Sequence, residues 1–393
     1  MTSVSFEKRN GTLYLIVEGR VDSTNADSVE KEINSIINSE NEKNVALDAD
    51  KLEYISSAGL RVLLRLRKSI PTFSIINASP EVYEIFEMTG FTEILPVEKA
   101  YRKLSVDGCE VIGQGANGKV YRLDADTIIK VYYNSDSLPD IHRERELARK
   151  AFILGIPTAI PYDVVKVGDS YGSVFELLNA KSFAKLIKAE PENLDKYTAL
   201  YADLLKKIHS TKVKPDDMPD MRLVALDWVK FLSDYLPGDT AQKLVSMVEA
   251  VPQDFHMMHG DYHIKNVMMQ NGEVLLIDMD TLCFGHPVFE LASMYNAYIG
   301  FYIIDRDAIK EFLGISNEEG EYIWKKTLSL YLDTDDENRI TQVENKAKII
   351  GYSRLMRRLI RRGGLENEKN RQEIEYYKEQ IIKLVGETDT LVF

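Results

Sequence analysis

The 393-residue chain has only two cysteines, Cys109 and Cys283, which lie far apart without the paired spacing of a zinc site. This scarcity argues against a disulfide framework or a cysteine-based structural metal, and it is typical of the reducing cytoplasm. No apolar run reaches the roughly 18 residues of a membrane span, and the first residues lack a basic segment followed by an apolar core. We therefore expect a cytoplasmic protein with no membrane partner.

Positive charge is also in short supply, because 49 Lys and Arg stand against 62 Asp and Glu, a formal net charge of −13. Broad nucleic-acid surfaces need a basic face, so we expect no nucleic-acid partner. Hydrophobic residues make up 45% of the chain, enough for a sizeable core. A chain of this length exceeds what one core usually supports, which predicts two or three domains.

Three regions differ in their pattern. Residues 1–105 alternate short strands with amphipathic helices, which predicts a compact α/β domain. The polar segment PVEKAYRKLSVDG marks a boundary near residue 105. Residues 106–180 indicate a small β-rich lobe with one helix, and residues 181–393 a mainly helical lobe. The expected fold class is therefore an α/β domain followed by a bilobal α+β domain.

A glycine pattern opens the second domain. Gly113, Gly115 and Gly118 form G-x-G-x-x-G, a spacing that also occurs in dinucleotide-binding folds. In those folds the last glycine opens a helix, but here it is followed by KVYRL, whose β-branched and aromatic residues predict a return strand. Such a hairpin lets backbone N–H groups approach triphosphate oxygens, and an ordinary flexible hairpin is the alternative.

Lys130 lies twelve residues after Gly118 within an apolar strand, where an unpaired charge would be costly. The following helix offers Glu144 and Glu146 as partners. Glu144 shares a helix face with Leu147 and is expected to point inward, although an exposed helix charge is the alternative. An inward Lys–Glu pair would orient the ammonium group on the α- and β-phosphates of ATP.

The most specific signal is His-Gly-Asp at residues 259–261, followed by Asn266 and by Asp278 within LLIDMD. Phosphoryl transfer needs a carboxylate to receive the proton of the acceptor hydroxyl, and oxygen ligands to hold Mg²⁺ against the phosphates. Asp261 suits the first role, and Asn266 and Asp278 suit the second. Single buried Asp and Asn residues are usually turn or cap residues, but these spacings behind a glycine loop and a strand lysine favour a magnesium site.

Residues 110 to about 300 resemble the aminoglycoside phosphotransferase and choline kinase branch of the protein-kinase-like superfamily. HGDYHIKN is similar to the H-G-D-x-H-x-x-N motif of that branch, and LIDMD is similar to its I-D-x-D motif. The resemblance implies that Asp261 is the catalytic base, that Asn266 and Asp278 bind magnesium, and that ATP is the phosphate donor. His263 stands where peptide kinases more often place a lysine.

The same resemblance implies roles in the small lobe. Lys130 would pair with Glu144, and the FELL segment would be the hinge whose backbone, at Glu176 and Leu178, meets adenine. Asp280 would assist the metal or stabilise its loop. One departure is Glu290 in GHPVFELA, where the family usually has aspartate, and we expect it to be structural.

The segment after Asp278 bears on the acceptor. Glu290 follows only twelve positions later with no A-P-E motif between, so the long activation segment on which peptide kinases dock their substrates is missing. A small molecule with a hydroxyl group is the expected acceptor.

Residues 1–100 resemble the STAS domain of anti-sigma-factor antagonists through EGRVDSTNA, ISSAGL and INASPEVYEIFEMTGF. In that family the phosphorylated serine falls at the position of Ser57, near a helix N-terminus that favours a phosphate. A simple serine N-cap is the alternative for Ser57. Ser56 stands where the family typically has aspartate, and Ala58 replaces the next hydroxyl residue.

Three functions are consistent with these patterns. The first is an ATP- and Mg²⁺-dependent phosphotransferase acting on a small molecule, with the STAS domain as a regulatory or docking module. The second is a regulatory serine kinase that phosphorylates Ser57 or the STAS domain of a regulatory partner protein, for which transfer within a homodimer is easier than transfer within one chain. The third is a nucleotide-sensing scaffold without turnover, against which the intact set of site residues argues.

Overall fold

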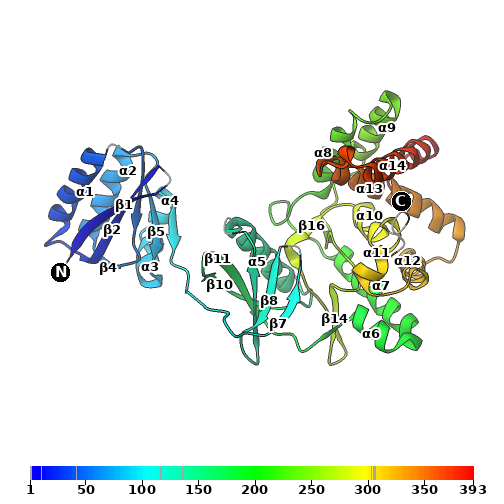
Figure 1. Cartoon of the computed structure of the whole chain (residues 1–393), viewed down its shortest axis with the longest axis horizontal. Coiled ribbons are helices and arrows are strands. Elements are labelled where there is room, and N and C mark those ends of the chain that lie inside the picture. Colours follow the sequence, from blue (N-terminus) through cyan, green and yellow to red (C-terminus); the bar gives the residue numbers. More distant parts are fainter. Residues whose placement is uncertain are drawn as a thin grey trace. The chain divides into compact units, whose positions relative to one another are not determined.

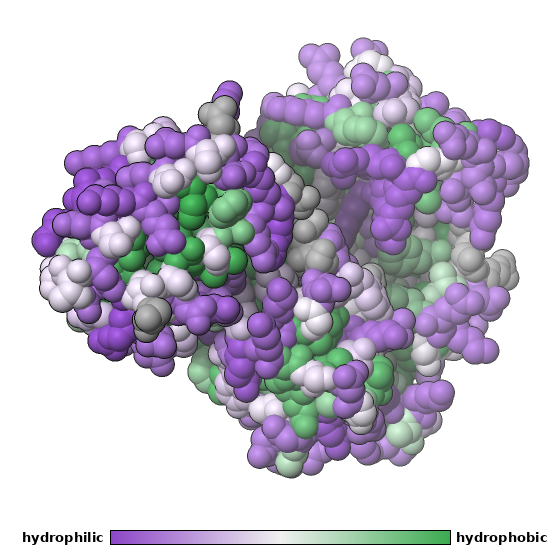
Figure 2. Space-filling model, turned by 60° about the vertical axis from the view of Figure 1, so that its left-hand side comes forward, coloured by the Kyte–Doolittle hydropathy of each residue, from purple (hydrophilic) through white to green (hydrophobic). Residues whose placement is uncertain are grey.

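The computed structural model describes residues 2–9, 11–40, 42–115, 117–134, 137–301, 303 and 307–393. The chain forms two compact units, Met1–Ser105 and Val106–Phe393, each with its own fold (Figure 1). On the face shown in Figure 2, most of the surface is hydrophilic, with groups of hydrophobic side chains between. No helix among the described residues is both long and apolar enough to cross a membrane.

The first unit is a six-stranded sheet in the order β1-β2-β3-β5-β6, with β4 also beside β2. Only β1 runs antiparallel to its neighbour. The strands are β1 (Ser3–Arg9), β2 (Thr12–Val21), β3 (Asn44–Asp48), β4 (Leu52–Ile55), β5 (Ser74–Ala78) and β6 (Val97–Lys99). The helices are α1 (Ala26–Glu40), α2 (Ser57–Ser69), α3 (Pro80–Met88) and α4 (Phe91–Ile94).

Alternation along β2 builds the core of this unit. Leu13, Leu15 and Val17 are at most 2% exposed, while the residues between them are only partly buried, the period of two that a sheet imposes. Gly59 of the ISSAGL motif is needed for packing, because a Cβ there would lie 2.6 Å from Ile55 Cγ1. The glycine therefore lets α2 pack closely on β4.

The second unit begins with a five-stranded antiparallel sheet in the order β10-β11-β9-β8-β7. A single long helix, α5, connects β9 to β10. The elements are β7 (Val111–Gln114), β8 (Gly118–Arg122), β9 (Thr127–Tyr132), α5 (Leu138–Ile153), β10 (Pro161–Val167) and β11 (Ser170–Glu176). This sheet and helix form the sheet-rich part of the second unit.

The rest of the second unit is mainly helical and contains two small sheets, β12-β14-β15 and β13-β16. The helices are α6 (Phe183–Ala189), α7 (Leu194–Ser210), α8 (Met221–Leu232), α9 (Gly238–Glu249), α10 (Val288–Tyr295), α11 (Ala308–Leu313), α12 (Asn317–Leu332), α13 (Glu337–Arg361) and α14 (Glu368–Glu387). The short strands are β12 (Lys181–Ser182), β13 (Met257–Met258), β14 (Val267–Gln270), β15 (Glu273–Leu276) and β16 (Cys283–Phe284). The loops between β13 and β14 and after β15 carry the HGD and IDMD motifs.

Candidate active site

Strands β7 and β8 form the hairpin expected from the glycine pattern, with Gly113 opposite Val120. The N–H of Gly115 donates to the carbonyl of Gly118 at 3.0 Å. A Cβ on Gly118 would lie 2.3 Å from the Val131 carbonyl oxygen, whereas a Cβ on Gly115 would meet nothing within 4 Å. Gly118 is therefore a packing requirement of the sheet, while a side chain at Gly115 would extend into open space.

Lys130 pairs with Glu144 and not with Glu146. Its Nζ lies 2.9 Å from Glu144 Oε1, and Glu144 is 4% exposed. Glu146 instead faces outward and lies 3.8 Å from Arg149. Tyr132 also donates a hydrogen bond to Glu144, a contact that the sequence pattern did not predict. The carboxylate is thus held by two side chains that lie on the same face of strand β9.

The Lys130 ammonium group also lies 3.1 Å from Asp278 Oδ1, and so joins the small lobe to the loop after β15. Burial alone would lower the pKa of Lys130, but the charges of Glu144 and Asp278 outweigh it and raise the pKa. Lys130 therefore stays charged at any physiological pH. A permanent cation between two carboxylates is suited to holding phosphate oxygens.

Asp278 has a left-handed backbone with φ 65° and ψ 66°, which is unusual for a residue with a side chain. Two positions later, Asp280 is half-buried, and burial together with the Asp278 and Glu144 charges raises its pKa to about 7. Lys130 opposes that rise without cancelling it. Negative charge is therefore in excess at this point, an arrangement that favours a bound cation.

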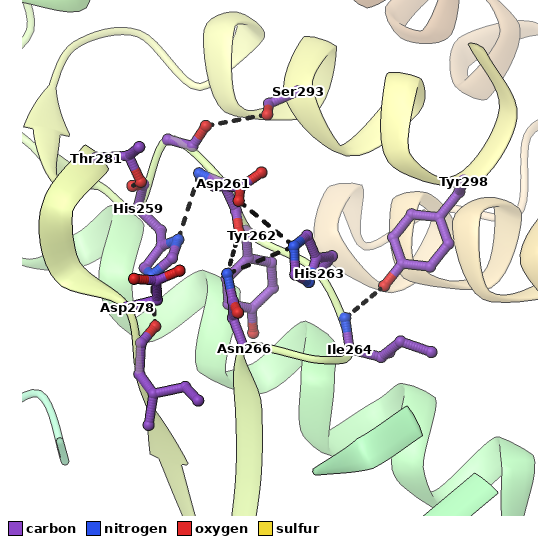
Figure 3. Close-up of polar contacts among 12 residues, drawn as sticks. His259, Asp261, Tyr262, His263, Ile264, Asn266, Asp278, Thr281, Ser293 and Tyr298 are labelled. Carbon is purple, nitrogen blue, oxygen red and sulfur yellow. Dashed lines mark hydrogen bonds and ion pairs between the residues drawn. The ribbon is translucent and has the colours of Figure 1, made fainter. Parts of the chain in front are cut away.

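The HGD loop positions Asp261 beside two polar partners (Figure 3). Asp261 Oδ2 lies 3.4 Å from His263 Nε2, and the Asp261 carbonyl accepts a 3.0 Å hydrogen bond from Asn266 Nδ2. Burial would raise the pKa of Asp261, but His263, His259 and Arg354 outweigh it and lower the pKa. The carboxylate is therefore ionised at neutral pH and can accept a hydrogen bond.

The His-Gly part of the motif fastens this loop to the loop of Asp278. His259 Nε2 donates to the Ile277 carbonyl at 3.1 Å, and Thr281 Oγ1 donates to the His259 carbonyl at 2.8 Å. Gly260 has φ 81°, and a Cβ there would lie 2.4 Å from the Thr281 carbonyl oxygen. Only glycine satisfies both conditions, so the motif brings Asp261, Asn266 and Asp278 to adjoining loops.

Glu290 is a structural residue of this site. It is 1% exposed, and its carboxylate accepts hydrogen bonds from the backbone N–H groups of His259 and Gly260. Burial would raise the pKa of Glu290, but nearby His209 and the bonds from the loop lower it. The glutamate thus holds the HGD loop from helix α10, as expected for a structural role in spite of its departure from aspartate.

Two tyrosines that the motifs did not reveal also hold the loop. Tyr201 of α7 stacks on Tyr262 with ring centroids 4.4 Å apart, and each hydroxyl donates to the other residue's carbonyl. The Tyr298 hydroxyl accepts a 3.0 Å hydrogen bond from the Ile264 N–H. No short motif contains these contacts, because α7 and the segment of Tyr298 are distant in sequence from HGD.

The residues of the expected hinge lie where β11 ends. The Glu176 N–H donates to the Ile160 carbonyl at 3.0 Å, and the next N–H, of Leu177, donates to the Asp126 carbonyl at 2.7 Å. Leu178 follows directly and is half-buried. Adenine binding by Glu176 and Leu178 stays a prediction.

At the N-terminal unit, the N-cap of α2 is Ser56, whose side chain accepts a 3.2 Å hydrogen bond from the Ala58 N–H. Ser57 is the first residue of the helix and is exposed. The interpretation of Ser57 as a simple N-cap is therefore wrong. Its hydroxyl stands at the positive end of the helix dipole without being the cap.

The donor set suits Mg²⁺. Nδ2 of Asn266 is engaged with Asp261, which leaves Oδ1 as the amide atom for a metal, and Asp278 and Asp280 supply carboxylate oxygens. Within the described ranges, no group of three or more His, Cys, Asp or Glu residues could hold a metal. Mg²⁺ needs no such group, because it commonly uses one or two carboxylates together with substrate phosphates.

Known proteins similar to the N-terminal unit are anti-sigma factor antagonists. BtrV of Bordetella bronchiseptica is 37% identical over 98 residues, which cover 24% of this chain and 84% of that protein. An anti-sigma F factor antagonist of Paenibacillus polymyxa is 24% identical over 98 residues, with the same coverage. A STAS domain model matches residues 3–104.

The second unit is similar to solved structures of small-molecule kinases. A choline/ethanolamine kinase family protein of Mesorhizobium loti is 16% identical with a TM-score of 0.46, covering 71% of this chain and 88% of that one. The streptomycin-ATP-APH(2'')-IIa complex is 13% identical with a TM-score of 0.49, covering 72% and 93%. The model of the phosphotransferase enzyme family matches residues 108–314, more than half of the chain. The chain therefore belongs to the phosphotransferase enzyme family and carries an N-terminal STAS domain.

Proposed function

We propose that this phosphotransferase moves the γ-phosphate of ATP, with Mg²⁺, to a hydroxyl group of a small molecule. The observation that carries the proposal is the contact of Lys130 with both Glu144 and Asp278, which brings the strand lysine to the loop that adjoins Asp261. The contact joins residues more than a hundred positions apart in the sequence. It gives the arrangement of a lysine beside carboxylates that phosphoryl transfer needs.

Each side chain has a defined task in this proposal. Lys130 binds phosphate oxygens, and the open turn at Gly115 offers backbone N–H groups to them. Asn266 and Asp278 would hold Mg²⁺, which would supply positive charge against the phosphates of ATP. Asp261 accepts a hydrogen bond from the acceptor hydroxyl and receives its proton.

The transfer balances without a further reactant. The hydroxyl oxygen of the acceptor forms a bond to the γ-phosphorus as the bond from that phosphorus to the β-bridging oxygen breaks. ADP leaves with the bond's electron pair, and the hydroxyl proton passes to the Asp261 carboxylate and then to solvent. The lowered pKa of Asp261 keeps the carboxylate ready to accept this proton.

The compact segment after Asp278 supports a small acceptor. A single 3₁₀ turn (Met279–Thr281) and the short strand β16 connect Asp278 directly to α10. That segment leaves no extended loop on which a peptide could lie. A second candidate, phosphorylation of Ser57 or of a partner's STAS domain, is favoured by the exposed hydroxyl at the start of α2.

Asp261→Asn tests the proposal. Removing the carboxylate charge while keeping the shape should lower kcat by about 10³-fold, measured as ADP release with sugars, amino alcohols and aminoglycosides as acceptors. Unchanged turnover in Asp261→Asn would overturn the proposal. Mass spectrometry after incubation with Mg·ATP separates the second candidate, since it requires a phosphate on Ser57 or on an added STAS domain.

A further inference from the structure

Three basic side chains lie near the HGD loop, and each lies over an aromatic ring. Lys265 Nζ lies 5.3 Å from the centroid of Phe312, and Arg358 lies 5.9 Å from that of Phe301. Arg354 lies 5.5 Å from the ring of Trp228. We call Lys265, Arg354 and Arg358 the basic rim.

Two chains of contacts tie the rim to the catalytic loop. Arg354 Nη1 donates to Ser293 Oγ at 2.9 Å, and Ser293 Oγ donates to the Gly260 carbonyl at 3.0 Å, next to Asp261. The other chain runs through rings: His263, 3.4 Å from Asp261, packs edge-on against Phe312 at 4.9 Å, and Phe312 packs against Phe301 at 6.2 Å. Both arginines therefore lie within electrostatic range of the Asp261 carboxylate.

The charges of the rim are not neutralised by the described part of the chain. None of the three forms an ion pair with a carboxylate there, and Arg354 donates a hydrogen bond to the neutral hydroxyl of Ser293. Arg357, one position from Arg358, shows the contrast: it pairs with Asp227 at 2.7 Å and lies over Phe231. A guanidinium group that lies over a ring keeps N–H groups available for phosphate or carboxylate oxygens.

We propose that the acceptor of this phosphotransferase is itself an anion, a hydroxylated small molecule bearing a phosphate or carboxylate group that the basic rim binds. This inference rests on the proposed function and specifies its substrate class. Aminoglycosides and choline are cations, and a rim with three positive charges repels them. The rim places the acceptor's anionic group near Arg358, so that its hydroxyl reaches Asp261.

A binding experiment tests the rim without knowledge of the acceptor. The full chain is loaded with Mg²⁺ and a non-hydrolysable ATP analogue to fill the triphosphate site, and inorganic phosphate is titrated in by calorimetry. Arg358→Gln should weaken phosphate binding about tenfold, because one charge-assisted contact is lost. Arg361→Gln, an exposed charge on the same helix outside the rim, should bind as the wild type does. Equal affinity in all three proteins, or no phosphate binding to the wild type, overturns the inference.

Turnover then tests the acceptor class and separates it from the proposed function. With glycerol 3-phosphate, glycerol and kanamycin as matched acceptors, kcat/KM should be highest for the phosphate ester. In Arg358→Gln the KM for that ester should rise about tenfold with kcat within about twofold, as expected for lost ground-state binding. Preference for kanamycin overturns the anionic acceptor but leaves phosphotransfer standing, whereas turnover that survives Asp261→Asn overturns the proposed function itself. If none of the three compounds accepts phosphate, the titration with inorganic phosphate decides whether the rim binds an anion.

Discussion

The candidate site has two parts of opposite charge. The part around Lys130, which we call the nucleotide side, has several carboxylates and one lysine, whereas the basic rim has several cations near one carboxylate. On the nucleotide side, Glu144, Asp278 and Asp280 surround Lys130. On the rim, Arg354 and Arg358 lie within electrostatic range of Asp261. Carboxylates that crowd one lysine need a cation, and cations that crowd one carboxylate need an anion. Under the proposed function, charge thus distinguishes a place for Mg·ATP from a place for the acceptor, although both meet at one loop.

Removing the support behind that loop should have the largest effect. Glu290→Ala leaves two backbone N–H groups without their buried acceptor and should lower the free energy of unfolding by about 3 kcal/mol. Glu290→Asp keeps the charge on a shorter side chain and should cost about 1 kcal/mol. Urea unfolding, followed through the transition of the second unit, measures the free energy of unfolding of both variants. Equal stability of Glu290→Ala and the wild type would contradict the role of Glu290.

Substitutions of the two glutamates of α5 test whether Glu144 positions Lys130 on the nucleotide side. Glu144→Gln loosens the Lys130 ammonium group and should lower kcat/KM for ATP about 100-fold, because a misplaced phosphate contact is costly. Glu146→Gln is the matched control, since Glu146 faces outward beside Arg149. Steady-state kinetics with ATP as the varied substrate distinguishes them. Similar losses in the two variants would show that Lys130 does not depend on Glu144.

Two glycines of the hairpin allow the packing of the sheet and the binding of ATP to be tested separately. Gly118→Ala places a methyl group against the Val131 carbonyl and should destabilise the protein by about 2 kcal/mol. Gly115→Ala meets open space, so its thermal stability should be unchanged while the KM for ATP rises. Thermal unfolding and ATP kinetics are measured on both variants. A stable Gly118→Ala protein would contradict the close approach of β8 and β9.

The smallest expected effect is a pH dependence of stability in metal-free buffer. The folded-state pKa of Asp280 is raised to about 7, so the folded protein holds this proton more tightly than the unfolded chain. That contribution is complete below the ordinary Asp pKa near 4 and is lost as pH rises through about 7, by about 1 kcal/mol because solvent reaches the group. Tm of the wild type should therefore fall from pH 5 to pH 8 relative to Asp280→Asn. The same change of Tm with pH in the two proteins would exclude a raised pKa of Asp280.

Local patterns predicted much of the nucleotide side. The glycine hairpin followed from KVYRL after Gly118, and the inward direction of Glu144 followed from its helix face, because both depend on neighbours a few positions away. The HGD and IDMD motifs likewise identified Asp261, Asn266 and Asp278, which lie on adjoining loops. The same local reasoning was wrong about the α2 cap, because Ser56 and Ser57 are adjacent and a shift of one residue decides which one caps.

The basic rim and the supports of the HGD loop were beyond local patterns. Ser293, Phe301 and Phe312 are unremarkable in the sequence, and they acquire roles only when α10, α11 and α13 pack around the loop. The stacking of Tyr201 on Tyr262 joins positions 61 apart. No periodicity or motif predicts such contacts, because they form between helices that are distant in sequence and neighbours in space.

The amino-acid sequence alone predicted an α/β domain ahead of a second domain with a sheet-rich and a helical part, and it singled out the side chains that we propose bind phosphate and metal. Those features follow from hydrophobic periodicity and from short motifs whose residues act through their own loops. Only the tertiary structure decided that Glu144 and not Glu146 meets Lys130, and that Glu290 holds the HGD loop. It also decided that Arg354 and Arg358, which pair with no carboxylate in the described part of the chain, act on Asp261. Long-range packing sets these distances, and charge acts through distance in space rather than through separation along the chain.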